Sequence, residues 1–460
     1  MKSFRINDKA AVSEDVVRMA IMDASRRKRS RQDVARILDN IEKNIELIQG
    51  MIVDETYRPR QHNTHIINDS GPHKQRQIVK PDYYPEQIVH HVVVEALKPG
   101  ISYGMSAFVL GSIPGRGAHK GKKYIEKWFR EDEQHTRIIG KMDIRHFFQS
   151  VDHEILRAWL HKKIRKSVIL DVCDIIIDAL EEGIPLGFYT SQWFSNFLLQ
   201  PLDHYIMEQL HVSHMTRYMD DIVVMGSNKR VIHQAVEAID LYLWHEYHLT
   251  MKKNWQVFRM EYETEEIAIT CPTMQELLAL DFRMVPRHKC KLYKKKRRIF
   301  IRPADLPKVQ QLVDQHHGQI EKVRMLHGRP LDYMGFEFHR DRTILRKSVM
   351  LSATRKAAAI GKADRINWVQ ACGMLSYIGW IDHSNTYAMY EYRIKPYISV
   401  RALKRIISTH QRRLNNETEL HHHAGLPGGT ARSSRCDIER GQGLPEEEHP
   451  ADHPDRQLRQ

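Results

Sequence analysis

Two adjacent carboxylates, Asp220 and Asp221, stand in the middle of the apolar stretch "TRYMDDIVVMG", residues 216–226. Neighbouring aspartates repel each other, and burying them costs free energy unless a cation compensates their charge. The pattern predicts two short strands joined by a two-residue turn, with both carboxylates at the tip of the hairpin. A solvated surface turn is the ordinary alternative, but such a turn rarely needs so apolar an exit strand as "IVVMG". The pair therefore indicates a cation site.

A third carboxylate, Asp143, follows the apolar segment "RIIGKM" and precedes a loop. If this strand end lies beside the hairpin, Asp143, Asp220 and Asp221 could hold two metal ions about 3.5–4 Å apart. Carboxylate oxygens are hard ligands, so Mg²⁺ is the expected ion, with Mn²⁺ as a substitute. In such a site, one ion would activate an attacking hydroxyl group, and the other would stabilise the leaving group.

The charge of the chain favours a polyanionic partner. Its 460 residues carry a formal net charge of +14, which favours nucleic acid first and an anionic membrane second. No run of eighteen apolar residues occurs, and the N-terminus lacks the apolar core of a signal peptide, so we expect no membrane association. The five cysteines are odd in number and contain no CxxC pair, which favours a reducing cytoplasm over a disulfide framework or zinc site.

The elements that must position the carboxylates alternate between strands and helices. This order predicts an α+β fold with an antiparallel sheet covered by helices. "THIIND" and "RQIVK" predict short strands, and "PEQIVHHVVVEALKPG" predicts a helix that starts after Pro85 and stops at Pro99 and Gly100. Residues 256–330 look like an insertion with a helical stretch near 304–326. "LDYMGFEFHRDRTILRKSV" predicts another hairpin, and residues 350–414 have a basic, helical pattern.

Six segments together resemble those of reverse transcriptases. "RYMDDIVV" resembles the active-site hairpin of that family, and "KMDIRHFFQSVDHEIL" resembles its first catalytic segment. "GIPLGFYTSQWFSN" resembles the loop that lies against the template and incoming nucleotide, and "KQRQIVKP" resembles the basic strand of the fingers. "LTMKKNW" resembles the lysine-bearing segment, and "LDYMGFEF" resembles the primer-grip hairpin. The six occur in the family's order from about residue 60 to 350.

The resemblance implies a right-hand polymerase fold with fingers, a palm built on the antiparallel sheet, and a helical thumb. It divides the chain into an N-terminal helical extension (1–54), fingers (55–140), a palm with the catalytic hairpin (141–255), an insertion (256–330), a primer-grip hairpin (331–349), a helical thumb (350–415) and a disordered tail (416–460).

The resemblance also implies a role for individual residues. Asp143 and Asp220 would be the main metal ligands, and Asp221 would complete the site. Lys252 would protonate or steady the pyrophosphate, with the next lysine as the alternative in register. Phe148 stands where the family has an aromatic steric gate that excludes ribose 2′-hydroxyls, or it is an ordinary core aromatic. The implied nucleotide-binding residues are Lys74 and Arg76 at the triphosphate, Phe148, Leu186, Gly187 and Gln192 in the loop, and Tyr218 before the aspartates.

The implied activity is DNA synthesis from a template RNA, a DNA or RNA primer and dNTPs. The resemblance is to bacterial and phage enzymes of the group II intron and retroelement kind. Leu186 stands where the family usually has Gln, and Gln192 where it usually has Pro. This variant, together with "MKKNWQVF" and "SYIGWIDHSNTY", resembles enzymes of diversity-generating retroelements. Without the Gln amide fidelity would fall, unless Leu186 simply packs under the loop. A small accessory protein is compatible with this reading. The alternatives are a defence-associated reverse transcriptase that acts against phage and a catalytically idle, maturase-like RNA-binding protein.

Overall fold

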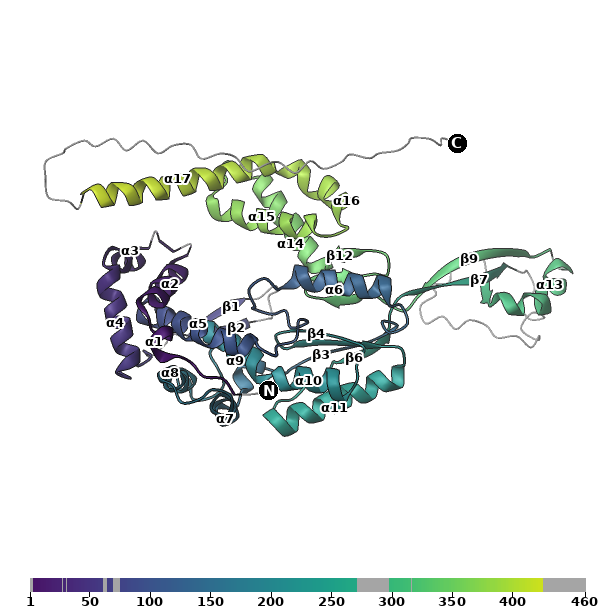
Figure 1. The fold of residues 1–460 in the computed structure, drawn as a ribbon. Helices are drawn as coiled ribbons and strands as arrows, with labels where there is room; N and C mark the ends of the chain where they lie inside the picture. The colour runs from purple at the N-terminus through teal and green to yellow at the C-terminus, as the bar shows by residue number, and fades with distance from the viewer. Residues whose placement is uncertain are drawn as a thin grey trace, which may run out of the picture. The chain divides into compact units, whose positions relative to one another are not determined.

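The computed structural model describes residues 3–26, 28–29, 31–60, 64–68, 75–270, 298–315 and 317–424 (Figure 1). The chain forms two units, Met1–His410 and Gln411–Gln460, and the folded core described below belongs to the first. Within the described ranges, every helix is too short or too polar to cross a membrane.

A four-stranded antiparallel sheet with the order β4–β5–β3–β6 forms the centre of the first unit. Helix α11 (Lys229–Tyr247) packs against β3, β5 and β6, and α6 (Ala118–Glu131) contacts β4. Figure 1 shows the sheet between these two helices. The strands are β3 (Ile138–Asp143), β4 (His214–Tyr218), β5 (Asp221–Gly226) and β6 (Gln256–Arg259).

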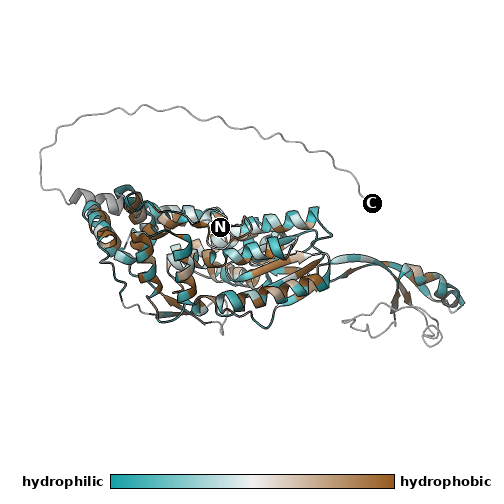
Figure 2. Ribbon diagram, turned by 60° about the horizontal axis from the view of Figure 1, so that its bottom comes forward, coloured by the Kyte–Doolittle hydropathy of each residue, from teal (hydrophilic) through white to brown (hydrophobic). Residues whose placement is uncertain are grey.

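The two faces of this sheet belong to different cores because strand side chains alternate between faces. Ile222 and Val224 join the core beneath α11, whereas Val223 and Met225 join a second core with α6 and the strands β10–β12. Both faces are therefore covered, and Figure 2 shows brown, apolar strand segments between the helices. The alternation also fixes the face on which each charged residue of these strands lies.

Helices surround the N-terminal part of the first core. Side-chain caps begin several of them: Asp152 accepts hydrogen bonds from the first turn of α7, and Ser167 does so for α8. The elements are α1 (Asp8–Ala11), α2 (Glu14–Ser25), α3 (Gln32–Asp39), α4 (Ile41–Val53), η1 (Tyr83–Gln87), α5 (Ile88–Ser102), η2 (Phe147–Ser150), α7 (His153–Lys163), α8 (Val168–Ile177), α9 (Tyr189–Leu198), α10 (Gln200–His204) and η3 (Tyr205–Gln209).

The predicted end of α5 at Pro99 and Gly100 is wrong by two residues, because the helix continues to Ser102. A proline so close to the end of a helix removes a single hydrogen bond, and the Pro99 carbonyl still accepts one from Tyr103 N at 3.3 Å. The next residue, Gly100, lies against the Phe4 ring, and a Cβ there would come within 2.2 Å of it. Packing of the N-terminal segment therefore holds the last turn in place.

The two predicted strands near residues 64–80 are confirmed as the antiparallel hairpin β1 (Thr64–Asn68) and β2 (Gln75–Val79). In the insertion, β7 (Tyr262–Thr270) pairs along its whole length with β9 (Gln319–His327) and also with β8 (Arg298–Ile301).

The predicted helical stretch near 304–326 is therefore only partly correct. Helix α13 (Leu306–Gln315) follows the short η4 (Pro303–Asp305), and the chain then returns as strand β9. Gly318 N donates to Val313 O at 2.7 Å where the helix ends. Nine residues of β9 pair with β7, and this distant partner overrides the local helical pattern.

The predicted hairpin after residue 330 is a three-stranded sheet, β10 (Leu331–Tyr333), β11 (Phe336–Phe338) and β12 (Thr343–Leu345). The helical pattern from residue 350 is confirmed by α14 (Lys347–Gly361), α15 (Trp368–Asp382), α16 (Tyr387–Met389), η5 (Tyr390–Ile394), η6 (Lys395–Tyr397) and α17 (Val400–Ala424). Helix α17 extends past the predicted tail boundary at residue 416, and residues 425–460 lie outside the described residues.

Candidate active site

The three aspartates meet at one end of the central sheet. Asp143 is the last residue of β3 and pairs directly with Asp221, the first residue of β5. Tyr218 of β4 pairs with Asp221 from the other side, so that Met219 and Asp220 form a two-residue turn. Like charges directly opposite each other on a sheet are destabilising. This register therefore concentrates negative charge at the tip of the hairpin, as the sequence predicts.

The carboxylate of Asp221 is short of partners. Its Oδ1 atom is buried and accepts no hydrogen bond within the described parts of the chain. Burial raises the pKa of Asp221, Lys141 opposes this rise, the negative charges of Asp143 and Asp220 add to it, and the resulting pKa is about 7. A buried carboxyl group of this kind becomes ionised more readily when a cation approaches it.

Lys252 approaches the same site from the segment that follows α11. Its Nζ atom lies 2.6 Å from Asp143 Oδ1, and its backbone N–H donates to Asp143 O at 2.9 Å. The Lys252 side chain remains 39% exposed. Of the two adjacent lysines, Lys252 is thus the one that contacts an aspartate, and Lys253 is exposed.

The donor set fits a hard divalent cation. Among the described residues, no group of three or more His, Cys, Asp or Glu side chains is arranged so that it could already hold a metal ion. The site nevertheless contains three carboxylates. One of them, Asp221, has an Oδ1 atom without a hydrogen bond and a raised pKa. Oxygen ligands with this much excess negative charge are those that Mg²⁺ and Mn²⁺ prefer. Asp143, Asp220 and Asp221 are the residues that would hold such an ion.

A buried charged network, which the sequence analysis missed, supports the turn. The Arg217 guanidinium is fully buried on the opposite face of the hairpin and forms two hydrogen bonds of 2.7 Å with Asp203 of α10. It also donates to Met219 O at 2.9 Å and to Asn196 Oδ1 of α9 at 3.2 Å. Arg217 therefore ties the aspartate turn to two helices. An arginine directly beside the "YMDD" segment is the signal that could have indicated it.

The turn itself has an unusual backbone. Met219 has φ 57°, a left-handed conformation that residues other than glycine rarely adopt. Gly111 leaves room for it, because a Cβ at Gly111 would lie 2.7 Å from Met219 N. Asn196 Nδ2 donates to Gly111 O at 2.9 Å and joins this contact to the Arg217 network. Such strain is maintained only where the surroundings determine the conformation, as they do here.

Phe148 lies in the short helix η2, shortly after Asp143. Its neighbour Phe147 is buried and takes the core position, whereas Phe148 is half-buried. The two rings meet edge to face with centroids 5.4 Å apart. Ile184 N donates to Phe148 O at 2.7 Å, which anchors the segment to the loop before α9. A partly accessible ring is compatible with the predicted steric gate.

The loop before α9 is joined to the β1–β2 hairpin. Leu186 O accepts a hydrogen bond of 2.9 Å from Val79 N, and Gly187 approaches Val79 so closely that a Cβ would lie 2.2 Å from its carbonyl oxygen. Gly187 also has φ 124°, so only glycine fits there. The Leu186 side chain is half-buried.

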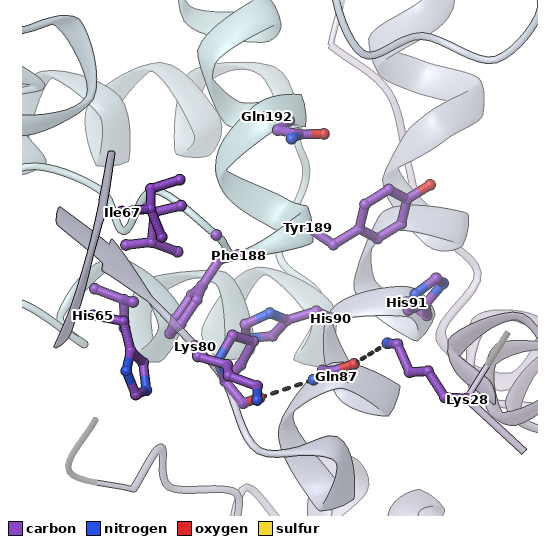
Figure 3. A pocket seen from close by; sticks show the side chains of 14 residues that line it. Lys28, His65, Ile67, Lys80, Gln87, His90, His91, Phe188, Tyr189 and Gln192 are labelled. Atoms are coloured by element: carbon purple, nitrogen blue, oxygen red, sulfur yellow. Dashed lines mark hydrogen bonds between the residues drawn. The ribbon is translucent and has the colours of Figure 1, made fainter. Parts of the chain in front are cut away.

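A cavity of about 490 Å³ lies where this loop, the hairpin and α5 meet (Figure 3). The rings of His91 and Tyr189 stack there with centroids 4.5 Å apart, and burial lowers the pKa of His91 to about 4. Lys28, from the N-terminal segment, donates to Gln87 at the rim. Neutral rings beside lysines suit the bases and phosphates of a nucleic acid strand. The lining includes Lys28, His65, Lys80, His91, Tyr189 and Gln192, and none of the three aspartates.

Residues 68–338, more than half of the chain, match the family model described as reverse transcriptase (RNA-dependent DNA polymerase). The chain belongs to the reverse transcriptase family. The predicted right-hand polymerase fold of α+β class is thereby confirmed, with the mixed helices and antiparallel sheets of the first unit. Reverse transcriptase domains use divalent metal ions, which agrees with the donor set at the hairpin tip.

More distant likenesses were found among solved structures, and no curated protein matches the chain. Telomerase from Candida albicans with a TWJ fragment of telomeric RNA is 11% identical, with a TM-score of 0.37, over 72% of this chain and 54% of that one. Apo telomerase from Candida tropicalis, truncated from its C-terminal domain, is 13% identical, with a TM-score of 0.33, over 43% and 49%. The reverse transcriptase chain thus spans about half of each telomerase, and likenesses this distant say nothing about its substrate.

The predicted site residues of this reverse transcriptase fall into two groups. Asp143, Asp220, Asp221 and Lys252 come together at the sheet end, with Tyr218 in the register beside them. Gly187 and Gln192 line the cavity. Arg76 lies in β2, although its side chain is outside the described residues, as is all of Lys74. The roles given to these residues remain predictions.

Proposed function

We propose that the chain is an RNA-directed DNA polymerase that makes cDNA at the Asp143, Asp220 and Asp221 cluster. The observation that carries the proposal is the register of the central sheet. It sets Asp143 opposite Asp221 at a strained turn, inside a domain of the reverse transcriptase family. A catalytically idle, RNA-binding role is less well supported, because a binding protein gains nothing from a buried carboxylate oxygen without a hydrogen bond, such as Asp221 Oδ1.

Each residue of the cluster has a distinct task in this proposal. The three carboxylates would hold two Mg²⁺ ions, or Mn²⁺ in their place, and these would supply positive charge to the 3′-hydroxyl and the leaving pyrophosphate. Lys252 Nζ lies beside Asp143 and can hand a proton to the pyrophosphate or stabilise its charge. Phe148 would exclude a ribose 2′-hydroxyl, so that dNTPs are used. Lys74 and Arg76 would neutralise the triphosphate.

The template would be RNA, held with a DNA or RNA primer through contacts between basic side chains and phosphates. The net charge of +14 favours phosphate contacts. The cavity beside Gly187 and Gln192 adds a stacked His91–Tyr189 pair and two lysines, which suits an unpaired base and its phosphate. Leu186 lacks the amide that the family usually places there, which would reduce fidelity modestly.

The altered loop supports a finer proposal, in which the enzyme serves a bacterial or phage retroelement of the diversity-generating kind, with a small accessory protein, in the cytoplasm. A defence-associated reverse transcriptase that acts against phage would share the same polymerase core. Sequencing the nucleic acid that co-purifies with the protein separates the two. A template copied into a variable gene would support the retroelement, and a cellular RNA would support the defence role.

Primer extension on an RNA template with dNTPs and MgCl₂ tests the activity. Wild type should extend the primer, whereas Asp220→Asn should lose about a thousandfold or more of the rate. Asp39→Asn is the matched control, because it removes the same group from an exposed position at the end of α3, outside the matched residues 68–338. Full extension by folded Asp220→Asn would overturn the proposal.

A further inference from the structure

Lys141 lies on β3, two residues before Asp143, so its side chain leaves the same face of the sheet as Asp143 and Asp221. Its Nζ atom is 4.0 Å from Asp221 Oδ2. The same atom donates a short hydrogen bond to the backbone oxygen of Asp332, the central residue of β10. One ammonium group therefore links the aspartate strand to the three-stranded sheet packed against it.

Tyr333 makes a second link between the same elements. It is fully buried, and its hydroxyl donates to Asp221 O at 3.1 Å. Lys141 Nζ lies 6.0 Å from the centre of the Tyr333 ring, within the range of a cation–π contact. The backbone of Asp221 is thus held by Tyr333, and its carboxylate faces Lys141. Both contacts reach β10, whose Asp332 carboxylate is paired in turn with Arg346.

Each of the two lysines at the site lies beside a different carboxylate. Lys252 contacts Asp143, and Lys141 is the one lysine or arginine of the described residues with a side-chain nitrogen within 4.0 Å of the Asp221 carboxylate. A positive charge so near a metal ligand acts in two ways. It competes with a bound cation for the negative charge of Asp221, and it holds that carboxylate in one place.

We propose that Lys141 is a positioning residue that fixes Asp221 and couples the metal-binding end of the sheet to the β10–β12 strands. The proposal deepens the proposed function and depends on it. Lys141 acts through Asp221 and Asp332, not on the substrate. Its removal should therefore separate two quantities: the cation should bind more tightly, because a competing charge is gone, and synthesis should slow, because Asp221 and β10 lose their common anchor.

Two variants and a control test this. Lys141→Met keeps the length of the side chain without its charge, and Lys141→Arg restores a cation and a donor. Lys229→Met removes the same charge from the exposed start of α11. Binding of Mn²⁺ alone is measured by the loss of its free electron paramagnetic resonance signal. The maximal rate of primer extension is measured at saturating MgCl₂ on folded protein.

Lys141→Met should bind Mn²⁺ about threefold to tenfold more tightly and extend the primer about tenfold more slowly than wild type. Lys141→Arg should recover most of the rate, and Lys229→Met should change neither quantity. Unchanged binding and rate in Lys141→Met, or weaker binding together with a lower melting temperature, would overturn the inference. If wild type itself makes no DNA, the proposed function fails. The Mn²⁺ titration then still tests whether Lys141 competes with a cation for Asp221.

Discussion

The β4–β5 hairpin carries charged side chains on both of its faces, and the two faces differ in how fully these charges are paired. On one face, Arg217 is joined by two hydrogen bonds to Asp203 of α10, and both side chains are 0% exposed. On the other face Asp221 is 28% exposed, and its Oδ1 has no partner among the described residues. The first set is neutralised within the protein, whereas the second is left short of positive charge.

This difference separates charges that hold the fold from charges that act on something outside it. A buried ion pair stabilises a fold only when it is well hydrogen-bonded, and Arg217 donates four hydrogen bonds within the protein, one of them to Met219 O. In the Asp143, Asp220 and Asp221 cluster, the buried carboxyl group of Asp221 instead lowers the stability of the free protein. Its presence is understandable if a divalent cation and the chemistry that it supports compensate for that cost.

The largest effect is expected on synthesis. Asp143→Asn removes a ligand and should reduce primer extension about a thousandfold or more. Its unfolding free energy should change by less than about 1 kcal/mol, because the Asp143–Lys252 pair is partly solvated. Urea unfolding followed by circular dichroism gives the stability of the same preparation. A large loss of stability would show that Asp143 stabilises the fold, as Arg217 and Asp203 do.

The opposite face should show the reverse behaviour. Arg217→Met leaves Asp203 buried without its partner and should lower the unfolding free energy by about 3–5 kcal/mol. The double variant Arg217→Met with Asp203→Leu should regain part of that loss, because no uncompensated charge remains. Urea unfolding of the two proteins checks this. If the single variant is as stable as wild type, the buried network does not hold the hairpin.

A smaller effect is expected at Lys252, which touches the cluster without being a metal ligand. Lys252→Gln should slow primer extension by about tenfold to a hundredfold, since a positioned proton donor or cation is lost. Stability should change by less than about 1 kcal/mol, because the side chain is 39% exposed. Lys253→Gln is the matched control and should be close to wild type. An equal loss of rate in both variants would show that the effect comes from the positive charge of this segment and not from the position of Lys252.

The catalytic part of this comparison could be predicted from the sequence. Asp220 and Asp221 interrupt an apolar run, and Asp143 ends another. Charged residues at such positions do not help to pack a core, so the local pattern indicates that they have a function. Six short segments in the right order then indicated the family. Such signals are visible because each lies within a few residues of the chain.

The supporting part could not be predicted in the same way. Arg217 and Asp203 are fourteen residues apart, and their pairing exists only once α10 packs beneath β4. The strand β9 was predicted as part of a helix because its partner β7 lies far away in the sequence. The helical end beyond Pro99 depends on contact with Phe4, nearly a hundred residues earlier. Tertiary contacts decided each of these cases.

Asp221 provides the most direct test, because stability and activity should change in opposite directions. Its pKa of about 7 in the folded protein lies above the ordinary value near 3.9 of an unfolded chain. The folded state therefore retains its proton longer. Stability is lost as the pH rises through the interval between these values and stays low above it. Asp221→Asn removes this penalty.

The decisive measurement is the unfolding free energy of wild type and Asp221→Asn in metal-free buffer at about pH 5 and pH 8, with primer extension on the same preparations. Since the side chain is 28% exposed, we expect Asp221→Asn to be more stable than wild type by about 1–3 kcal/mol at the higher pH. The difference should be smaller at the lower pH, and the variant should lose synthesis. A variant that loses both stability and synthesis, or that keeps full synthesis, would contradict the account.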